Sequence, residues 1–100
     1  MLLDTDRQKL EALIKEKLGE TQGLFFVTGT LDDGSGSRPE GVLAFGSQKV
    51  AFAARDILSG EVWKEWPKDG VQNLALDDEL LGAKLTFNAG GSAVALERIP

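Results

Sequence analysis

The chain has 100 residues, of which 42% are hydrophobic, and a formal net charge of −5. A chain of this length forms one domain that buries roughly two-thirds of its unfolded surface, so it can build a core without staples. It contains no cysteine and no histidine, which excludes disulfides, thiol nucleophiles and the usual zinc sites. With 11 basic residues against 16 acidic ones, it lacks the cationic surface by which proteins hold nucleic acids and anionic membranes.

The first residues carry acids after a very short apolar start, with Asp4 and Asp6 close behind Leu2 and Leu3. A signal peptide needs a basic start and an apolar stretch of about 7–15 residues. A membrane-spanning helix needs roughly 18 or more apolar residues. The sequence matches neither pattern, and it therefore predicts a soluble, cytoplasmic protein, a location that the lack of cysteine also fits.

The first predicted element is a helix over residues 6–18, with apolar residues at the i, i+3, i+4 spacing of one stripe. Thr5 is a candidate N-cap, with Gln8 completing a capping box. Gly19 stands where a left-handed C-terminal cap belongs. We interpret the charged residues on the other face as solvated surface rather than as a partner-binding face. The apolar stripe consists of Leu10, Leu13, Ile14 and Leu18.

From Leu24 onward the pattern changes to short segments rich in β-branched and aromatic residues, separated by glycine-rich turns. The longest connection, residues 31–40, is predicted to be a flexible, disordered loop. Pro67 ends the fourth segment, because proline cannot donate to a strand ladder. Seven such strands predict an antiparallel barrel or sandwich that is closed or nearly closed. The predicted strands cover residues 24–30, 41–46, 49–55, 61–66, 71–76, 83–88 and 92–99.

The segment GVLAFGSQKVAFAAR resembles a hairpin of bacterial pleckstrin-homology-like (PH-like) and GRAM-like domains. It departs from the family pattern at Ser47 and Lys49, where threonine and arginine are usual. The similarity continues through EVWKEWPKDGVQNLAL and LGAKLTFNAGGSAVAL. The matching positions quoted for this resemblance are Gly41, Leu43, Val50, Phe52, Trp66, Pro67 and Val71.

The resemblance covers residues 23–99. It implies a mainly β (α+β) fold, namely a PH-like antiparallel barrel or sandwich of seven strands. The whole chain, residues 1–100, would be a single PH-like domain with one N-terminal helix and no C-terminal helix. A standard member of the family plugs one barrel mouth with a C-terminal helix, so helix 6–18 or a partner subunit is expected to cover that mouth here. The resemblance also implies a function, because bacterial members look like oligomerising or partner-docking modules rather than lipid sensors.

Phosphoinositides, the ligands that the family name suggests, are not expected to bind. In the eukaryotic domains, lysines and arginines on the first two strands and the loop between them hold the phosphates. The equivalent loops here, taken with Arg55, carry two basic residues against four acids, which repel a multiply charged anion. The residues concerned are Arg38, Arg55, Asp32, Asp33, Glu40 and Asp56.

Few residues are placed for chemistry. The acidic loop at residues 32–40 lacks the EF-hand spacing, and residues 77–79 show no converging oxygen ligands for a metal ion. Glu61 and Glu65 lie on one strand face but four residues, or roughly 13 Å, apart, beyond the carboxylate separation of glycosidases. The sequence therefore predicts no catalytic residue, no metal and no cofactor.

Apolar residues outside the expected core are the remaining functional signal. Trp63 cannot share the strand face of Trp66, so one tryptophan is expected to point away from the main core. Exposed apolar patches mark protein contacts, and tryptophan is enriched at interface centres. Alternatively, these residues fold over the barrel ends and are buried there. The candidate interface residues are Trp63, Ile57, Leu58, Leu80 and Leu81.

These observations predict a non-catalytic PH-like module that acts through protein–protein contacts, above all by self-association, and does not bind nucleic acid. An alternative is a carrier of a small apolar ligand, and a third class is an enzyme with carboxylate chemistry. The carrier would use a barrel mouth lined by Phe25, Phe45, Phe52 and Phe87.

Overall fold

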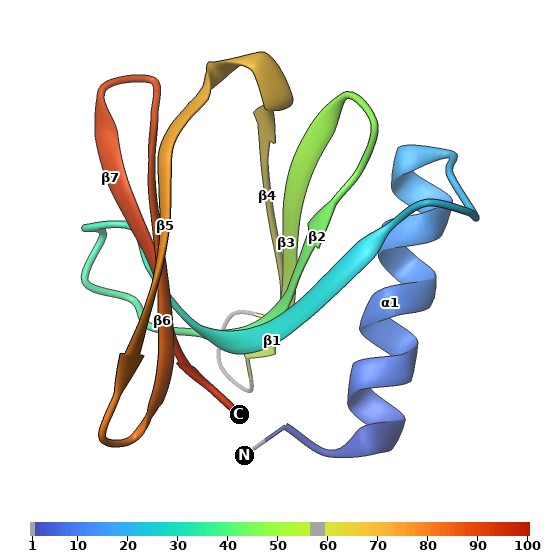
Figure 1. Cartoon of the computed structure of the whole chain (residues 1–100). Helices are drawn as coiled ribbons and strands as arrows, with labels where there is room; N and C mark the ends of the chain where they lie inside the picture. Colours follow the sequence, from blue (N-terminus) through green and yellow to red (C-terminus); the bar gives the residue numbers. More distant parts are fainter. Residues whose placement is uncertain (1, 57–59) are drawn as a thin grey trace.

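A computed structural model describes residues 2–56 and 60–100. Within these ranges one α-helix precedes a single sheet of seven antiparallel strands, and no helix follows the last strand (Figure 1). The mainly β fold with an N-terminal helix, predicted from the sequence, is confirmed. The elements are α1 (Asp4–Leu18), β1 (Phe25–Asp32), β2 (Glu40–Phe45), β3 (Lys49–Asp56), β4 (Gly60–Pro67), the 3-10 turn η1 (Lys68–Gly70), β5 (Val71–Glu79), β6 (Gly82–Ala89) and β7 (Ser92–Ile99).

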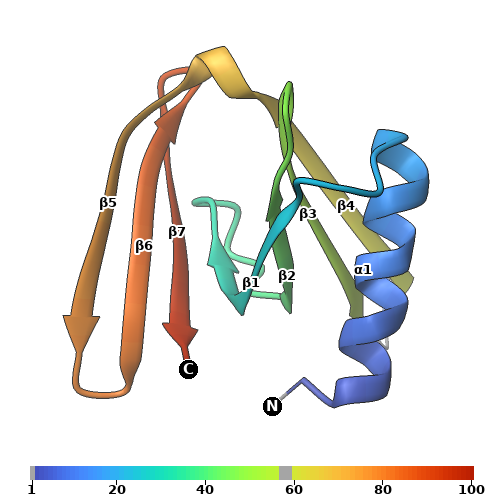
Figure 2. The same ribbon diagram turned by 45° about the vertical axis from the view of Figure 1, so that its right-hand side comes forward.

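The strand order in the sheet is β4-β3-β2-β1-β7-β6-β5. Strands that follow one another in the chain are therefore neighbours, except that β4 and β5 form the two free edges, so the sheet does not close into a barrel. The sheet folds instead into two halves that face each other, one formed by β1–β4 and the other by β5–β7. The helix α1 lies outside the first half (Figures 1 and 2). At one corner η1 joins the halves, where the Lys68 ammonium donates a 2.9 Å hydrogen bond to the Gly46 carbonyl in the β2–β3 turn.

The main core lies between the two halves. Phe52 of β3 is completely buried there, and Phe87 of β6 is almost so. Trp66 of β4 packs edge-on against Phe87, with ring centroids 5.5 Å apart, so the core links the edge strand β4 to β6 in the other half of the sheet. Its other buried members are Leu31, Leu43, Val50, Ala54, Leu85, Ala89, Val94 and Leu96.

A second core lies on the outer face of β2 and β3, beneath α1. Leu10 and Ile14 of the helix are buried against Val42, Ala44 and Ala53. Because successive side chains of a strand point to opposite faces, β3 supplies Phe52 to the main core and Ala53 to this one. The predicted stripe of α1 therefore covers the outside of the sheet rather than the mouth between its halves. Of the two covers expected for the mouth, the helix or a partner subunit, the helix does not take that role.

Trp63 and Trp66 fall on opposite faces of β4, as strand alternation predicted. Trp66 belongs to the main core and Trp63 to the second core. The Lys17 ammonium of α1 lies 4.9 Å from the Trp63 ring centroid, a distance at which the cation and the ring attract each other. The tryptophan that points away from the main core is thus partly covered by the helix.

The start of α1 differs from the prediction. The helix begins at Asp4, with Leu3 as N-cap and no capping hydrogen bond from a side chain, so the predicted N-cap, Thr5, lies inside the helix. Acidic residues in the first turn interact favourably with the helix dipole, and the earlier start places both Asp4 and Asp6 in that turn. The C-terminal prediction is confirmed, because Gly19 caps the helix at φ 70° and donates to the Lys15 carbonyl.

Two connections are shorter than predicted. The strand β5 continues to Glu79, beyond the predicted end at residue 76, because Asp77 and Asp78 pair with Lys84 and Ala83 of β6. Ladder pairing thus overrides the low strand propensity of aspartate. The segment 31–40, predicted to be a disordered loop, begins only after β1 has reached Asp32. Ion pairs join Asp33, near its start, to Lys64 and Arg38, near its end, to Glu97.

Candidate functional site

The most distinctive surface feature is an apolar groove between the two halves of the sheet. The strand β1 pairs with β7 only over Thr30–Asp32, while its earlier residues, from Phe25 onward, pair with β2 alone. The two halves therefore diverge on this side and leave a groove of about 650 Å³. Residues that line it include Phe25, Val27, Phe45, Leu74, Leu76 and Ile99.

The β5 wall of the groove is open to solvent. Every residue of β5 after Val71 is exposed, including Leu74 at 55% and Leu76 at 65%. Leu76 lies opposite Leu85 in the register, so it is on the core-facing side of the sheet, yet nothing covers it. Phe25, on the opposite wall, is 65% exposed. Contiguous exposed apolar surface of this kind marks interaction sites in globular proteins.

The other free edge, β4, is protected. Lys64 lies opposite Phe52 in the β3 register, so its side chain is on the core-facing side of the sheet. There its ammonium forms an ion pair with Asp33, which follows β1. The hydrogen bond from Lys64 is the main reason that the pKa of Asp33 is lowered from 3.8 to about 2. An inward-pointing charge on an edge strand discourages pairing with a strand of another chain. The β4 edge is therefore less suited to such pairing than the β5 edge.

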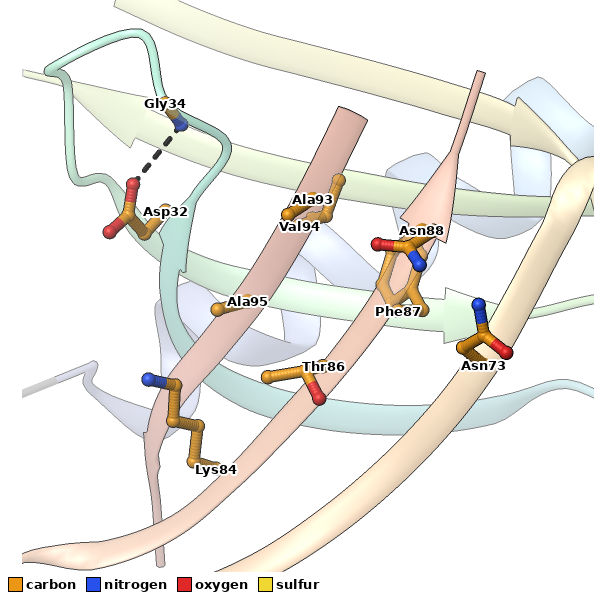
Figure 3. Close-up of a pocket in the computed structure, with 10 residues that line it drawn as sticks. All are labelled: Asp32, Gly34, Asn73, Lys84, Thr86, Phe87, Asn88, Ala93, Val94 and Ala95. Carbon is orange, nitrogen blue, oxygen red and sulfur yellow. Dashed lines mark hydrogen bonds between the residues drawn. The ribbon is translucent and has the colours of Figure 1, made fainter. Parts of the chain in front are cut away.

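A second depression, of about 470 Å³, lies on the outer face of β5, β6 and β7. In Figure 3, Asn73 of β5 lies beside Thr86 and Asn88 of β6. Asp32, which accepts a hydrogen bond from the Gly34 N–H, lies beyond β7. No polar or charged residue is buried within the described ranges, and no group of three acids there could hold a metal ion. The depression therefore lacks the buried, converging polar groups of a built binding site.

The structure places the predicted interface residues in different environments. Leu80 is fully exposed and Leu81 is 75% exposed, in the turn that follows β5. Trp63 is partly buried against α1, far from that turn in the strand order. Ile57 and Leu58 lie outside the described residues. Those of the five candidates that are described therefore lie at separate places on the molecule.

Of the four phenylalanines expected to line a ligand pocket, only two do so. Phe25 and Phe45 line the groove, whereas Phe52 and Phe87 are enclosed in the main core. The sequence reasoning missed Leu74 and Leu76, which it assigned to an ordinary strand. Their spacing of two residues does indicate a common face, but only the strand order reveals that this face belongs to an uncovered edge.

Within the described ranges no helix is long and apolar enough to cross a membrane. Comparison of the chain with protein-family models, with curated proteins and with solved structures gave no match. The functional interpretation therefore comes from the groove and the strand edges themselves.

Proposed function

We propose that the chain is a non-catalytic, PH-like protein-interaction module that works by self-association. The contact surface is the groove together with the free edge of β5. The observation that carries this proposal is the exposure of Leu74 and Leu76 on an edge strand, directly beside an apolar groove of about 650 Å³.

A polypeptide partner suits this surface because it satisfies both of its features. Burying apolar side chains stabilises a complex by about 25 cal/mol per Å² of apolar surface, and an added strand also pairs with the free backbone groups of an edge. A small apolar molecule would fill the groove but would leave the backbone of β5 unpaired. A second copy of the chain supplies both kinds of contact from an identical surface.

The charge distribution supports a protein partner over an anionic ligand. Arg38, the basic residue of the β1–β2 loop, forms an ion pair with Glu97 of β7. Binding a phosphorylated headgroup at this loop would have to break that pair and overcome nearby acids. We propose accordingly that phosphoinositides and nucleic acids are not partners, that no cofactor is used, and that the module acts in the cytoplasm.

Light scattering on a sizing column, over a series of protein concentrations, tests self-association. We expect a dimer whose share grows with concentration, and we expect Leu76→Glu to abolish it by placing a charge in the contact. Leu3→Glu is the matched control, because Leu3 is 63% exposed but lies at the start of α1, outside the groove. A mass that stays monomeric at every concentration contradicts the proposal.

A carrier of a small apolar ligand is the second candidate, favoured by one observation. The groove volume of about 650 Å³ lies within the range of roughly 300–1,000 Å³ that ligand pockets occupy. The test is calorimetric titration of the monomer with 1-dodecanol, a neutral apolar probe. Saturable one-to-one binding that Leu76→Glu abolishes, in a protein that stays monomeric, would favour the carrier over the interaction module.

A further inference from the structure

We propose that two copies join by antiparallel pairing of their β5 strands about a two-fold axis at Ala75, which merges their two sheets into one. This inference rests on the proposed self-association and adds its geometry. Among the described strands, β5 pairs with β6 on one side only, so the backbone groups on its other side are free to pair. An antiparallel pair of identical strands is the symmetric, closed way to use such an edge.

The charges of β5 select the antiparallel direction. The strand ends in three acids, Asp77, Asp78 and Glu79, and begins with three uncharged residues. A parallel, in-register pair would place acid beside acid, and like charges directly opposite each other destabilise a sheet. An antiparallel pair about Ala75 instead sets Asp77 opposite the uncharged Asn73 of the other copy.

The same register joins the exposed leucines. It sets Leu74 of each copy opposite Leu76 of the other, so that four leucines meet on the core-facing side of the merged sheet. Cross-strand apolar pairs of this kind stabilise a sheet. Ala75 lies at the axis with only a methyl group, so the two strands can approach. The contact continues the apolar wall of both grooves and covers the surface that each copy leaves exposed.

A bulge limits the length of the ladder. The β5–β6 register shifts between Gln72 and Ala75, and Asn73 has a left-handed backbone at φ 58°. A bulge bends its strand and increases the local twist. We therefore expect regular pairing over Leu74–Leu76, with Asn73 and Asp77 facing each other at its ends and the acids beyond Asp77 turned towards solvent.

Pairing of β5 with the β4 edge of another copy is disfavoured. That edge carries Glu61 and Glu65, which are already paired with Lys17 and Lys49, so these lysines are not free to pair with the acidic end of β5. Its inward Lys64 is already held by Asp33. A β5–β4 contact would also be head-to-tail and would propagate into open filaments rather than close. The electrostatics of the two edges thus favour the two-fold dimer.

Disulfide trapping tests this geometry cleanly because the natural chain has no cysteine. Ala75→Cys places a thiol at the axis. There it faces the same thiol of the second copy, at a distance that a disulfide can span. Glu61→Cys, on the exposed part of the β4 edge, is the control. We expect Ala75→Cys to cross-link on the order of 100-fold faster than Glu61→Cys under mild oxidation, because association raises the effective thiol concentration.

The register has its own readout. In an equimolar mixture of Leu74→Cys and Leu76→Cys chains, we expect mixed disulfides to outnumber each homodimeric product well beyond the about twofold excess that random pairing gives, because the axis sets position 74 against position 76. Thermal unfolding of each reduced variant checks that it keeps its fold. If one does not, the pair Asn73→Cys and Asp77→Cys takes its place, and these two chains are also expected to form mixed disulfides.

The outcomes separate this inference from the proposed function. A dimer by light scattering in which Ala75→Cys cross-links no faster than Glu61→Cys overturns the β5 geometry and leaves self-association standing. A dimer with fast Ala75→Cys linking but no preference for mixed 74–76 products overturns the register. A monomer at every concentration overturns both.

Discussion

The two free edges of the sheet differ in how far their apolar side chains are exposed to solvent. On β4, Trp63 lies under the Lys17 side chain of α1, and the one inward-facing charge, Lys64, is paired with Asp33. On β5, the inward-facing Leu74 and Leu76 remain exposed. Edge strands tend to pair with other chains unless a charge or a covering element prevents it. In this fold the β4 edge is thus protected from strand pairing, and the β5 edge is not.

The difference extends to the two halves of the sheet. The β2–β3 half is buried on both faces, because the main core lies on one side and α1 on the other. The β5–β6–β7 half has a core on one face only, and its outer face carries polar residues such as Lys84 and Thr86. The first half is thus covered on both faces, whereas the outer face of the second is exposed to solvent.

The largest effect expected from this comparison is at two phenylalanines. Phe52→Ala should lower the free energy of unfolding by about 3–5 kcal/mol, because it opens a cavity in the closed main core. Phe25→Ala, in the open groove, should cost less than about 1 kcal/mol. Urea unfolding of both variants checks this, with Phe52→Leu as a milder variant if Phe52→Ala does not fold. Equal costs at the two positions would show that the groove is packed like the core.

The helix should matter almost as much. Ile14→Ala removes a completely buried side chain beneath α1 and should cost about 2–5 kcal/mol. The control is Leu80→Ala, at a fully exposed position after β5, which should change stability by no more than about 0.5 kcal/mol. Thermal unfolding measures both. An Ile14→Ala protein as stable as its parent would mean that α1 does not contribute to the second core.

The ion pair that guards β4 should give a smaller, pH-dependent effect. The pKa of Asp33 is lowered from 3.8 to about 2, so the folded state holds this proton more weakly than the unfolded chain does. The pair therefore stabilises the protein at pH values above the ordinary pKa. Its contribution decreases as the pH falls from 3.8 through about 2. Because solvent screens the pair, we expect a contribution of about 1 kcal/mol.

Asp33→Asn tests this expectation. Urea unfolding should show the variant to be less stable than the parent at neutral pH, with the difference shrinking as the pH falls through the same interval. Lys64→Met, which removes the other partner, should show a pH-dependent difference over that interval too. A difference between Asp33→Asn and its parent that stays constant down to the lowest pH would contradict the role of the pair.

The smallest effect on stability is expected at the β5 edge itself. Leu76→Gln should change the free energy of unfolding of the monomer by no more than about 0.5 kcal/mol, because its side chain is largely solvated already. Leu85→Gln, at the facing register position on β6, should be strongly destabilising, because it buries an amide in the core. Measurements at a concentration that gives only monomer separate this effect from association. A large loss at Leu76 would show that β5 is covered in the monomer.

The sequence by itself determined the elements of this protein. The leucine stripe and Gly19 indicated the helix, and strand alternation assigned Trp63 and Trp66 to opposite faces of β4. These patterns are local, because a helix repeats every 3.6 residues and a strand every two. The extension of β5 through Asp77 and Asp78 was missed, because pairing with β6 and not local propensity decides it.

Only the tertiary structure decided which faces are covered. The stripe of α1 fits any apolar surface, and the fold places it on the outside of β2 and β3 rather than over the mouth. Leu74 and Leu76 lie in a predicted strand, and their spacing of two residues places them on one face without showing whether that face is covered. Whether such a face is buried depends on strand order. Here β1 pairs with β7 over only three residues, and β5 is an edge strand of the sheet. Long-range pairing, which no local pattern encodes, therefore created the groove and the open edge on which the proposed function depends.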